Sequence, residues 1–452
     1  MSFDKVLIAN RGEIALRVIR ACRELGIQTV LVYSEADAHS LPVHLADEAI
    51  CIGPPSARES YLNIPAIISA CLISGAQAVH PGYGFLSENA DFSEVCREHG
   101  IVFIGPPPEV LARFHDKAAT RTLMRQFGLP LVPGSDGPVR TTSEALRVAE
   151  AIGYPVMLKA RAGGGGRGMR KATNAKELQR LLEQARAEAK ASFGDDGIYI
   201  ERNLEGVRHI EAQILADEHG NAICFGEREC SIQRRNQKMI EEAPSASIGL
   251  ELQHRIARLA ADAARRSGYR NVGTWEFLVD QNGEPYFIEV NARIQVEHTV
   301  TEMVTGVDLV KEQIALAAGE PLSLSEEQVW VNGHAIECRI NAEDPDDDFA
   351  PSSGVLTTYL QPAGPGIRVD SHCFQGYEVP PYYDSLLAKV IAWGRDRPEA
   401  VARMQRALDE MTIVGVKTNI AAHKKILASD LFREGKVTTH LIDTVGIEAL
   451  AG

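Results

Sequence analysis

The order of apolar and polar residues predicts a repeated strand–helix pattern at the start of the chain. The apolar run at residues 5–10 (KVLIAN) is typical of a buried strand. An apolar stripe then follows on one face of a helix that ends at Gly26, formed by Ile14, Val18, Cys22 and Leu25. The same rhythm continues at residues 28–34, 78–84 and 101–106, so we expect a parallel α/β domain over residues 1–115.

The pattern changes after residue 115 and predicts two further regions. A stretch rich in proline and glycine at 128–138 marks a boundary, and we interpret a compact unit of helices and short strands over about 131–203 as an insertion. Longer strands are expected at 209–217, 222–230, 273–280 and 285–293. A third region has strands at 334–343 and 385–394 and a helix from Pro398. We therefore expect domains at 116–333 and 334–446.

Composition and charge narrow the class of protein. The net charge of −14 over 452 residues argues against nucleic acid or an anionic membrane as a partner. The eight cysteines include no CxxC pair, so we expect buried reduced thiols and not a zinc or redox site. The chain has no apolar run of membrane-spanning length and no signal-peptide core. We expect a cytoplasmic protein, or a mature protein of an organelle matrix.

Four consecutive glycines stand among basic residues in KARAGGGGRGMR, residues 159–170. Glycine lets backbone N–H groups approach anionic oxygens because no Cβ is in the way, and the basic side chains add charge. The spacing differs from the GxxxxGK[ST] of a Walker P-loop. Lys159 on the preceding strand therefore indicates a lid that closes over a nucleotide. A flexible hairpin tip is the alternative.

A second pattern, TWEFLVDQNGEPYFIEVNAR at 274–293, predicts a β-hairpin. Asn282-Gly283 is typical of a two-residue type I′ turn. That register places Glu276 opposite Glu289, with Cβ atoms about 4.5–5.5 Å apart, and Asn291 on the same face. Facing carboxylates repel unless a cation lies between them, so the hairpin predicts a Mg²⁺ or Mn²⁺ site shared with phosphates. The alternative is a solvated, charged sheet face.

The residues after this hairpin predict an oxyanion site. If NARIQVEHTVTE stays extended, Arg293, Gln295 and Glu297 share a side with Asn291. An arginine holds a planar oxyanion through two parallel hydrogen bonds, and a nearby glutamate can take its proton. A surface ladder of ion pairs is the alternative. Lys238 in SIQRRNQKMIEEAP adds positive charge.

Two further residues have less specific surroundings. His209 lies on a predicted strand beside the apolar Ile210, where a lone histidine is more often structural. Tyr83 is expected to be exposed in a tight turn between Gly82 and Gly84.

Together these stretches resemble one family over nearly the whole chain. The motifs are IANRGEIALRVIRACRELG, HPGYGFLSENA, GGGGRGMR, ERECSIQRRNQK, RIQVEH, ECRINAEDP and PPYYDSLLAK. They are similar to those of biotin carboxylases, the ATP-grasp subunits of biotin-dependent carboxylases. Carbamoyl phosphate synthetases share the ATP-grasp fold but not this set of motifs. The resemblance implies an α/β and α+β chain. It would have an N-terminal Rossmann-like domain, an ATP-grasp domain with a mobile glycine-rich lid, and a C-terminal α+β domain.

The resemblance also implies roles for individual residues. It implies ATP contacts at Lys117, Lys159, Gly165, Gly166, Glu201, Arg202, Asn203, Leu204, His209 and Asn236. Metal ions, Mg²⁺ or Mn²⁺, would be held at the same nucleotide by Glu276, Glu289 and Asn291. Bicarbonate would be surrounded by Lys238, Arg293, Gln295 and Val296, with Glu297 as its general base. Arg339 would lie beside the ureido ring of biotin, with Tyr83 near it.

The implied activity is ATP- and bicarbonate-dependent carboxylation of biotin N1 through carboxyphosphate. We expect it as the first half-reaction of acetyl-CoA carboxylase in fatty acid synthesis; a pyruvate, propionyl-CoA or other biotin-dependent carboxylase is the alternative. The implied partners are a biotin carboxyl carrier protein, carboxyltransferase subunits and a second copy of the chain. Departures from the family pattern at Arg161, Ala162 and Asn236 bear on lid motion and ATP affinity.

The biotin itself is expected on a separate carrier. The chain contains no Met-Lys step of the kind that biotinylated hairpins present, and the sequence ends at Gly452, soon after the third region. Two other function classes are an ATP-grasp ligase that activates a carboxylate for attack by an amine and a non-catalytic nucleotide-binding regulator. The intact RIQVEH and ECRINAED motifs argue against the first, and the presence of Lys238, Arg293, Glu297 and Arg339 together argues against the second.

Overall fold

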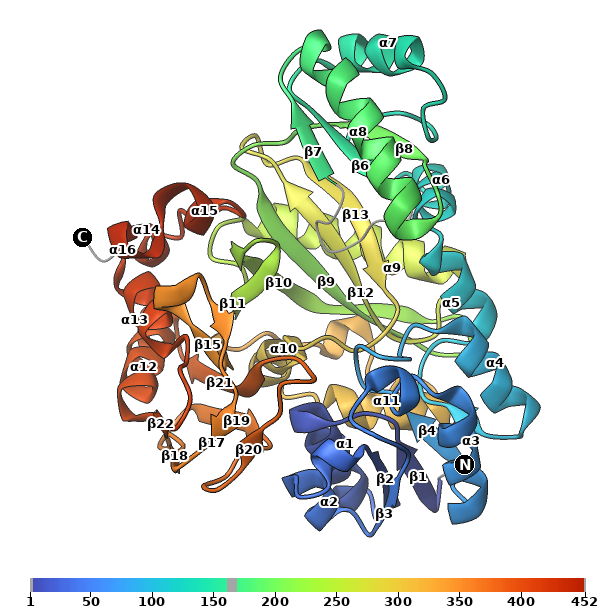
Figure 1. Ribbon diagram of the computed structural model, residues 1–452, viewed down its shortest axis with the longest axis vertical. Coiled ribbons are helices and arrows are strands. Elements are labelled where there is room, and N and C mark those ends of the chain that lie inside the picture. The colour runs from blue at the N-terminus through green and yellow to red at the C-terminus, as the bar shows by residue number, and fades with distance from the viewer. Residues whose placement is uncertain (1–2, 161–168, 451–452) are drawn as a thin grey trace.

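The N-terminal region is a parallel α/β layer, shown in blue in Figure 1. The computed structural model describes residues 3–160 and 169–450. Five parallel strands have the order β3-β2-β1-β4-β5: β1 (Lys5–Ile8), β2 (Gln28–Tyr33), β3 (Glu48–Cys51), β4 (Ala78–His80) and β5 (Val102–Phe103). The helices are α1 (Gly12–Glu24), α2 (Leu41–Leu45), α3 (Ile64–Ser74), α4 (Ala90–Glu98) and α5 (Pro108–His115). The predicted parallel α/β fold is confirmed, with β3 as an additional edge strand.

The chemistry of α1 explains where it begins and ends. Of its predicted apolar stripe, Ile14, Val18 and Cys22 are buried, whereas Leu25 is the C-cap residue and is exposed. Gly26 follows with φ +73°, a left-handed conformation that glycine adopts at no steric cost. The helix starts directly after Asn10 and Arg11, at the carboxyl end of β1, where parallel sheets of this kind bind ligands.

A small unit above the main sheet has its own core. Its antiparallel strands, in the order β7-β6-β8, are β6 (Val156–Ala160), β7 (Met169–Ala172) and β8 (Ile198–Arg202), and they are covered by α7 (Thr142–Ile152) and α8 (Ala175–Phe193). In Figure 1 it stands at the top of the molecule. On β6, Val156 and Leu158 are buried against the helices, so the alternating Met157 and Lys159 face the other way.

The largest sheet joins two regions that the sequence separated. Eight strands have the order β13-β12-β9-β10-β11-β14-β21-β19. The first five are β9 (Arg208–Ala216), β10 (Ala222–Arg234), β11 (Gln237–Ala243), β12 (Asn271–Val279) and β13 (Pro285–Asn291). The rest are β14 (His334–Asn341), β19 (Ile367–Ser371) and β21 (Leu386–Gly394). Because β14 pairs with β11, the third predicted region extends the sheet of the second.

Helices cover this sheet on both faces. Those of the middle region are α6 (Lys117–Gln126), α9 (Leu250–Ser267), α10 (His298–Thr305) and α11 (Leu309–Ala317). Those of the C-terminal region are α12 (Arg397–Glu410), α13 (Ile420–Ala428), α14 (Asp430–Arg433), α15 (Leu441–Val445) and α16 (Ile447–Leu450). Trp275 and Phe277 of β12 pack with Ile256 and Ala260 of α9 in one core. Among the described residues, no helix combines the length and apolar character needed to cross a membrane.

Three short strand pairs complete the C-terminal region. They are β15 (Glu343–Asp344) with β16 (Ala350–Pro351), β17 (Gly354–Val355) with β20 (Glu378–Val379), and β18 (Thr358–Leu360) with β22 (Thr412–Val414). All eight cysteines are unpaired, and seven of them are buried.

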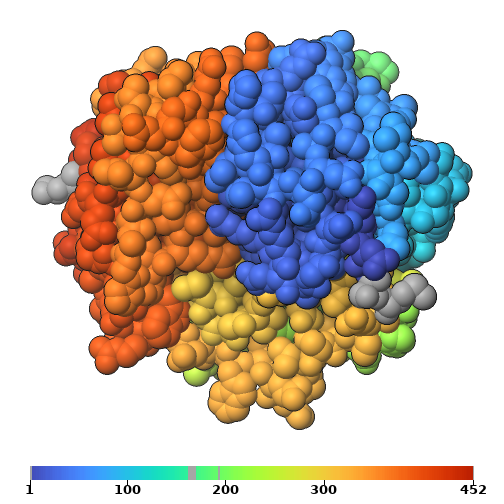
Figure 2. Space-filling model, turned by 90° about the horizontal axis from the view of Figure 1, so that it is seen from below, coloured from blue at the N-terminus to red at the C-terminus, as the bar shows by residue number. Residues whose placement is uncertain are grey.

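The N-terminal and C-terminal regions meet along a continuous seam, visible in Figure 2 between the blue and orange surfaces. The Arg11 guanidinium lies 4.3 Å from the ring centre of Tyr383, and the Ser34 and Tyr383 hydroxyl oxygens are 2.5 Å apart. Lys389 of β21 is fully buried with its Nζ 3.2 Å from Glu13 Oε1 of α1. Three of these residues, Arg11, Glu13 and Tyr383, also line the large central cavity.

Candidate active site

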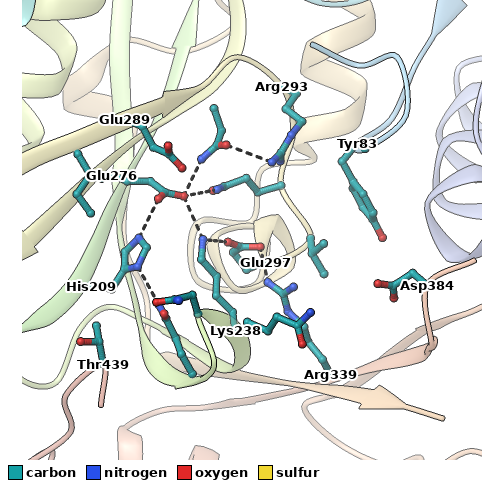
Figure 3. A pocket seen from close by; sticks show the side chains of 18 of the residues that line it. Tyr83, His209, Lys238, Glu276, Glu289, Arg293, Glu297, Arg339, Asp384 and Thr439 are labelled. Atoms are coloured by element: carbon teal, nitrogen blue, oxygen red, sulfur yellow. Dashed lines mark hydrogen bonds and ion pairs between the residues drawn. The ribbon is translucent and has the colours of Figure 1, made fainter. Parts of the chain in front are cut away.

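One large cavity, of about 1270 Å³, is lined by residues from all three regions of the chain. Figure 3 shows part of its wall. It gathers every predicted site residue that the structure describes: Tyr83, Lys117, Lys159, Glu201, Arg202, Asn203, Leu204, His209, Asn236, Lys238, Glu276, Glu289, Asn291, Arg293, Gln295, Val296, Glu297 and Arg339. The two predicted glycines, Gly165 and Gly166, lie outside the described residues.

Three carboxylates stand side by side on one face of the main sheet. Glu276 of β12 is paired in register with Glu211 of β9 on one side and with Glu289 of β13 on the other. The neighbours Ile210, Ala212 and Phe277 belong to the core on the opposite face. The predicted Glu276–Glu289 pair is therefore present.

The turn between the two strands differs from the predicted one. The Asp280 N–H donates to the Glu284 carbonyl and the Gly283 N–H to the Asp280 carbonyl, so residues 281–283 form a three-residue loop. Gly283 has φ +81°, the conformation expected where a type I turn ends in a bulge. Phe277 then faces Phe287, and a shift of one residue at Ile288 restores the Glu276–Glu289 register. The prediction of a two-residue turn was wrong, and the bulge compensates for the difference.

Lys238 of β11 is the cation at the centre of the site. Its Nζ lies 2.7 Å from Glu297 Oε1 and 3.1 Å from Glu276 Oε1, and it also donates to Glu211 (Figure 3). Burial alone would lower the pKa of Lys238, but these three carboxylates raise it well above its usual value. In turn, Lys238 overcomes the effect of burial on Glu211 and lowers its pKa to about 2. The cluster is therefore ionised at neutral pH.

His209 is part of this cluster and is not a lone core residue. Its Nε2 lies 3.1 Å from Glu276 Oε2 and 3.3 Å from Glu211 Oε1, and Nδ1 is 2.9 Å from the amide nitrogen of Gln233. Burial opposes the charged imidazole, yet the two glutamates raise the pKa of His209 to about 9. The two glutamates therefore favour the charged form of His209.

Glu297 lies between two cations. The chain leaves β13 after Asn291, so the extended run expected for 291–297 does not form, and Glu297 instead precedes α10 as its N-cap residue. Its Oε1 accepts from Lys238, and its Oε2 lies 2.9 Å from Arg339 Nη2 of β14. Burial opposes ionisation, but Lys238 and Arg339 lower the pKa of Glu297. An ionised carboxylate held by two cations can accept a proton from a bound acid.

Arg293 is oriented by a glutamate that the sequence analysis did not single out. Glu88 Oε2 lies 3.2 Å from Arg293 Nε, and Glu88 Oε1 accepts from the Ala292 N–H at 3.0 Å. Arg293 Nη2 also donates to Asn291 Oδ1 at 3.1 Å. The guanidinium thus faces the cavity with its angle fixed, which suits a planar oxyanion.

Basic residues line the side of the cavity nearest the small upper sheet. Lys159 Nζ lies 2.6 Å from Glu201 Oε2, and Arg121, another residue not predicted, lies 2.8 Å from Glu201 Oε1. Lys117 Nζ lies 2.8 Å from Glu289 Oε2. At the β10–β11 turn, Arg235 and Asn236 have φ +50° and +63°, which places Asn236 at the cavity rim. Positive charge at this wall suits a polyphosphate.

Tyr83 is half-buried, not exposed as predicted, because its hydroxyl donates to Glu13 of α1. In Figure 3 it lies across the cavity from His209, near Arg339 and Asp384. Glu13 in turn contacts Lys389, whose Nζ donates to the Val296 carbonyl at 2.9 Å. Tyr83 is thereby linked to the segment that carries Glu297.

Glu276 and Glu289 are the two carboxylates expected to hold a divalent cation. Carboxylate oxygens are the ligands that Mg²⁺ prefers, and the two side chains oppose each other across the hairpin. The oxygen of Asn291 already accepts from Arg293, and its amide nitrogen donates to Glu276 at 2.6 Å. Asn291 therefore orients Glu276 in this structure.

Three family models together match almost the whole chain. "Biotin carboxylase, N-terminal domain" matches residues 2–111. "Carbamoyl-phosphate synthase L chain, ATP binding domain" matches residues 116–325, and "Biotin carboxylase C-terminal domain" matches residues 337–444.

Curated relatives and solved structures agree with these models. The biotin carboxylase of Nostoc sp. is 55% identical, covering 98% of this chain and 99% of the relative. A pyruvate carboxylase subunit of Methanothermobacter thermautotrophicus is 53% identical, covering 99% and 91%. The biotin carboxylase domain dimer of Hydrogenobacter thermophilus 2-oxoglutarate carboxylase, in complex with MgADP, ADP and bicarbonate, superposes with a TM-score of 0.94 at 51% identity, covering 98% of both chains. Similar in sequence and in its ATP-grasp fold over nearly its whole length, this chain belongs to the biotin carboxylase family.

Proposed function

We propose that this chain carboxylates N1 of biotin on a separate carrier protein, as the first half-reaction of acetyl-CoA carboxylase. Its family makes it an ATP-dependent ligase that carboxylates biotin, with ATP, Mg²⁺, bicarbonate and biotin as reactants and cofactor. The observation that carries the detailed proposal is Glu297, which is buried and ionised between Lys238 and Arg339 in the shared cavity.

We assign the first chemical step to Glu297 and Arg293. Arg293 and Lys238 hold bicarbonate, with Gln295 and Val296 beside it, and Glu297 takes the bicarbonate proton. The bicarbonate oxygen then attacks the γ-phosphorus of ATP, and the bond to the β,γ-bridging oxygen breaks to give carboxyphosphate and ADP. Lys117 and Lys159 neutralise charge on the phosphates, and the segment Glu201–Leu204, His209 and Asn236 bind the nucleotide.

We assign the second step to Arg339, with Tyr83 near the biotin ring. Carboxyphosphate breaks down to CO₂ and phosphate, and the phosphate removes the N1 proton of biotin. Arg339 stabilises the negative ureido oxygen that results, and N1 then attacks CO₂. Bound at Glu276 and Glu289, with Asn291 as a third ligand or as their orienting partner, Mg²⁺ would supply charge neutralisation at the phosphates.

The proposal also covers the oligomeric state, the cellular location and the partner proteins of the enzyme. The dimeric relative from Hydrogenobacter thermophilus supports a homodimer. We place the enzyme in the cytoplasm, with a biotin carboxyl carrier protein and carboxyltransferase subunits as its partners, as the resemblance of the sequence implies. A pyruvate carboxylase is the second candidate, because one relative is part of that enzyme. We further propose functional units at 1–115, 116–333, with a lid at about 131–203, and 334–446.

The proposal is tested by incubating the purified chain with ATP, Mg²⁺, biotin and radiolabelled bicarbonate. The expected result is ATP cleavage that requires bicarbonate and label that appears in carboxybiotin. ATP cleavage that requires an amine and another carboxylate would instead show a different ATP-grasp ligase. Purification with native partners, followed by assay with acetyl-CoA and pyruvate, distinguishes the two parent complexes.

Glu289→Gln is expected to weaken Mg²⁺-dependent ATP turnover without destabilising the fold. Glu289 is partly exposed, and its carboxylate forms an ion pair with Lys117, so the neutral amide relieves its repulsion with Glu276. The Mg²⁺ concentration for half-maximal turnover should rise about 10- to 100-fold, as for other changes around a bound metal. The measurement is ATP turnover against Mg²⁺ concentration, with melting in the absence of metal as the control. A lower melting temperature together with an unchanged Mg²⁺ requirement contradicts the assignment.

A biotinylated carrier is expected to be a much better substrate than free biotin. Docking of the carrier supplies binding energy that orients the ureido ring, and each ~1.4 kcal/mol so used raises kcat/KM about tenfold. The measurement compares kcat/KM for the two substrates. Equal values, or a biotin adduct on this chain after expression with an active biotin ligase, contradict the use of a separate carrier.

A further inference from the structure

A second pair of facing carboxyl groups lies directly behind Glu297 and Arg339. Glu241 of β11 is paired in register with Glu337 of β14, and both residues are fully buried. Cross-strand partners have Cβ atoms about 4.5–5.5 Å apart, close enough for their carboxyl groups to meet. Glu241 Oε1 accepts from Arg339 Nε at 2.6 Å. Glu337 Oε2 accepts from the Thr299 hydroxyl of α10.

The remaining oxygen of each carboxyl has no hydrogen-bond partner. Glu241 Oε2 and Glu337 Oε1 are both buried, and neither receives a hydrogen bond from any part of the chain that the structure describes. A buried polar oxygen without a donor is costly, and a buried carboxylate beside a second one is more so. One proton placed between the two side chains would satisfy both oxygens, because a protonated carboxyl donates and a carboxylate accepts.

The surrounding charges cannot neutralise two carboxylates here. Arg339 is shared between Glu241 and Glu297, and Lys389 is occupied by Glu13 and the Val296 carbonyl. Lys238, also nearby, already forms ion pairs with three other carboxylates. The charged groups that face the pair are Lys238 from β11, Arg339 from β14, Lys389 from β21 and Glu297 from the start of α10.

Burial raises the pKa of both carboxyl groups. It raises the pKa of Glu241 against the opposing effect of Arg339, with Glu297 adding to the rise. It raises the pKa of Glu337 well above the usual value against the effect of Lys389, and Glu241 adds to it. Interacting carboxyl groups release their protons as a pair, so one proton is retained at neutral pH.

We propose that Glu241 and Glu337 share one proton, and that this proton positions Arg339 for the biotin step. With one negative charge on the pair, Arg339 is anchored by Glu241 yet still reaches Glu297 and the cavity. Loss of the shared proton would add a second negative charge behind Arg339 and draw the guanidinium away from the substrate. The positioning role rests on the proposed function, whereas the shared proton does not.

The consequence is a fall in kcat/KM for biotin at alkaline pH that originates in these two residues. Glu337→Gln should remove that fall, because the amide nitrogen donates permanently to Glu241 and its oxygen still accepts from Thr299. Its kcat/KM at pH 7 should stay close to that of the parent. Glu337→Met has a similar size but cannot donate, so it should lose kcat/KM on the order of 10²-fold, the effect of a misplaced active-site group.

Steady-state kinetics over a range of pH distinguish these outcomes. Equal losses in Glu337→Gln and Glu337→Met, or an alkaline fall that persists unchanged in Glu337→Gln, would overturn the positioning role. If Glu337→Met does not fold, the pH profile of Glu337→Gln and the spectra described next decide the matter.

Infrared spectroscopy tests the shared proton independently of activity. At pH 8 the parent should show a protonated carboxyl band that shifts in D₂O and is absent from both Glu337→Gln and Glu241→Gln. Bands from other buried acids occur in all three proteins and cancel in the difference spectra. Identical spectra for the parent and the two variants would overturn the proposal. If the carboxyl band is present but the chain has no carboxylase activity, the shared proton is supported and the proposed function is rejected.

Discussion

Replacement of Glu297 by glutamine is expected to lower bicarbonate-dependent ATP cleavage by about 10²–10⁴-fold, the usual cost of removing a general base. The amide keeps the size of the side chain and accepts a hydrogen bond, but it cannot take a proton. Bicarbonate would then attack as the protonated and weaker nucleophile. Because Glu297 contacts Lys238 and Arg339, in the part of the cavity where we propose that bicarbonate binds, nucleotide affinity should remain near normal.

The measurement combines ATP turnover at saturating bicarbonate with the dissociation constant for MgATP. Glu284→Gln is a matched control, because Glu284 lies at the exposed hairpin turn and contacts Arg255. Equal turnover in Glu297→Gln and the parent refutes the role of general base. Lost nucleotide binding in Glu297→Gln would show that the carboxylate holds the site together instead of taking the proton.

The sequence could predict those parts of the site that lie on regular strands. The alternation of β12 and β13 predicted the facing Glu276 and Glu289, although the turn between them has another geometry. The same alternation on β9 places Glu211 beside His209, and it was available in HIEAQ. Glu211 was missed because one acidic residue on a strand looks like any solvated position until its neighbours in space are known.

Residues brought together by sheet order could not be predicted in this way. Glu88 meets Arg293, and Glu241 meets Glu337, across sequence separations of 205 and about 96 residues. The separation of the second and third regions also hid the β11–β14 pairing, on which the second acid pair depends. Local patterns specify the strands, whereas the order of strands in the sheet is determined by packing of the whole core.

The conformation of residues 292–297 is a further feature that local sequence patterns could not predict. An extended run would have placed Arg293, Gln295 and Glu297 on one side by simple alternation, and these side chains do line the same cavity. They reach it by another route, through an irregular segment held by Glu88 and Lys389. Hydrogen bonds from distant residues replace the regular geometry of a strand, and no local pattern encodes them.

The second large effect is expected for Lys238→Met, which should lower the free energy of unfolding by about 3–5 kcal/mol at pH 8, the cost of leaving a buried charge without its partner. Methionine preserves most of the apolar stem, so the change removes the ammonium more than the packing. Glu211, Glu276 and Glu297 would keep Arg228, His209 and Arg339 as partners but lose Lys238, which contacts all three.

The loss in the free energy of unfolding of Lys238→Met should become smaller as the pH falls. The direction of this pH dependence follows from the pKa values of the three carboxylates. In the parent their folded-state pKa values are lowered, so they stabilise the fold above the unfolded value of about 4.3 and lose this effect only at lower pH. In Lys238→Met, burial is no longer opposed by Lys238, so these pKa values rise. The variant therefore gains protons on folding and recovers stability relative to the parent between pH 8 and pH 5.

Denaturant unfolding at pH 8 and at pH 5 measures this difference. Lys311→Met is the matched control, since Lys311 forms an exposed ion pair with Glu24, a kind of pair that contributes about 0–1 kcal/mol. A large deficit in Lys238→Met that is the same at both pH values would point to lost packing. Only a deficit that decreases toward pH 5 identifies Lys238 as the charge that keeps three buried carboxylates ionised, the condition under which Glu297 can act as a base.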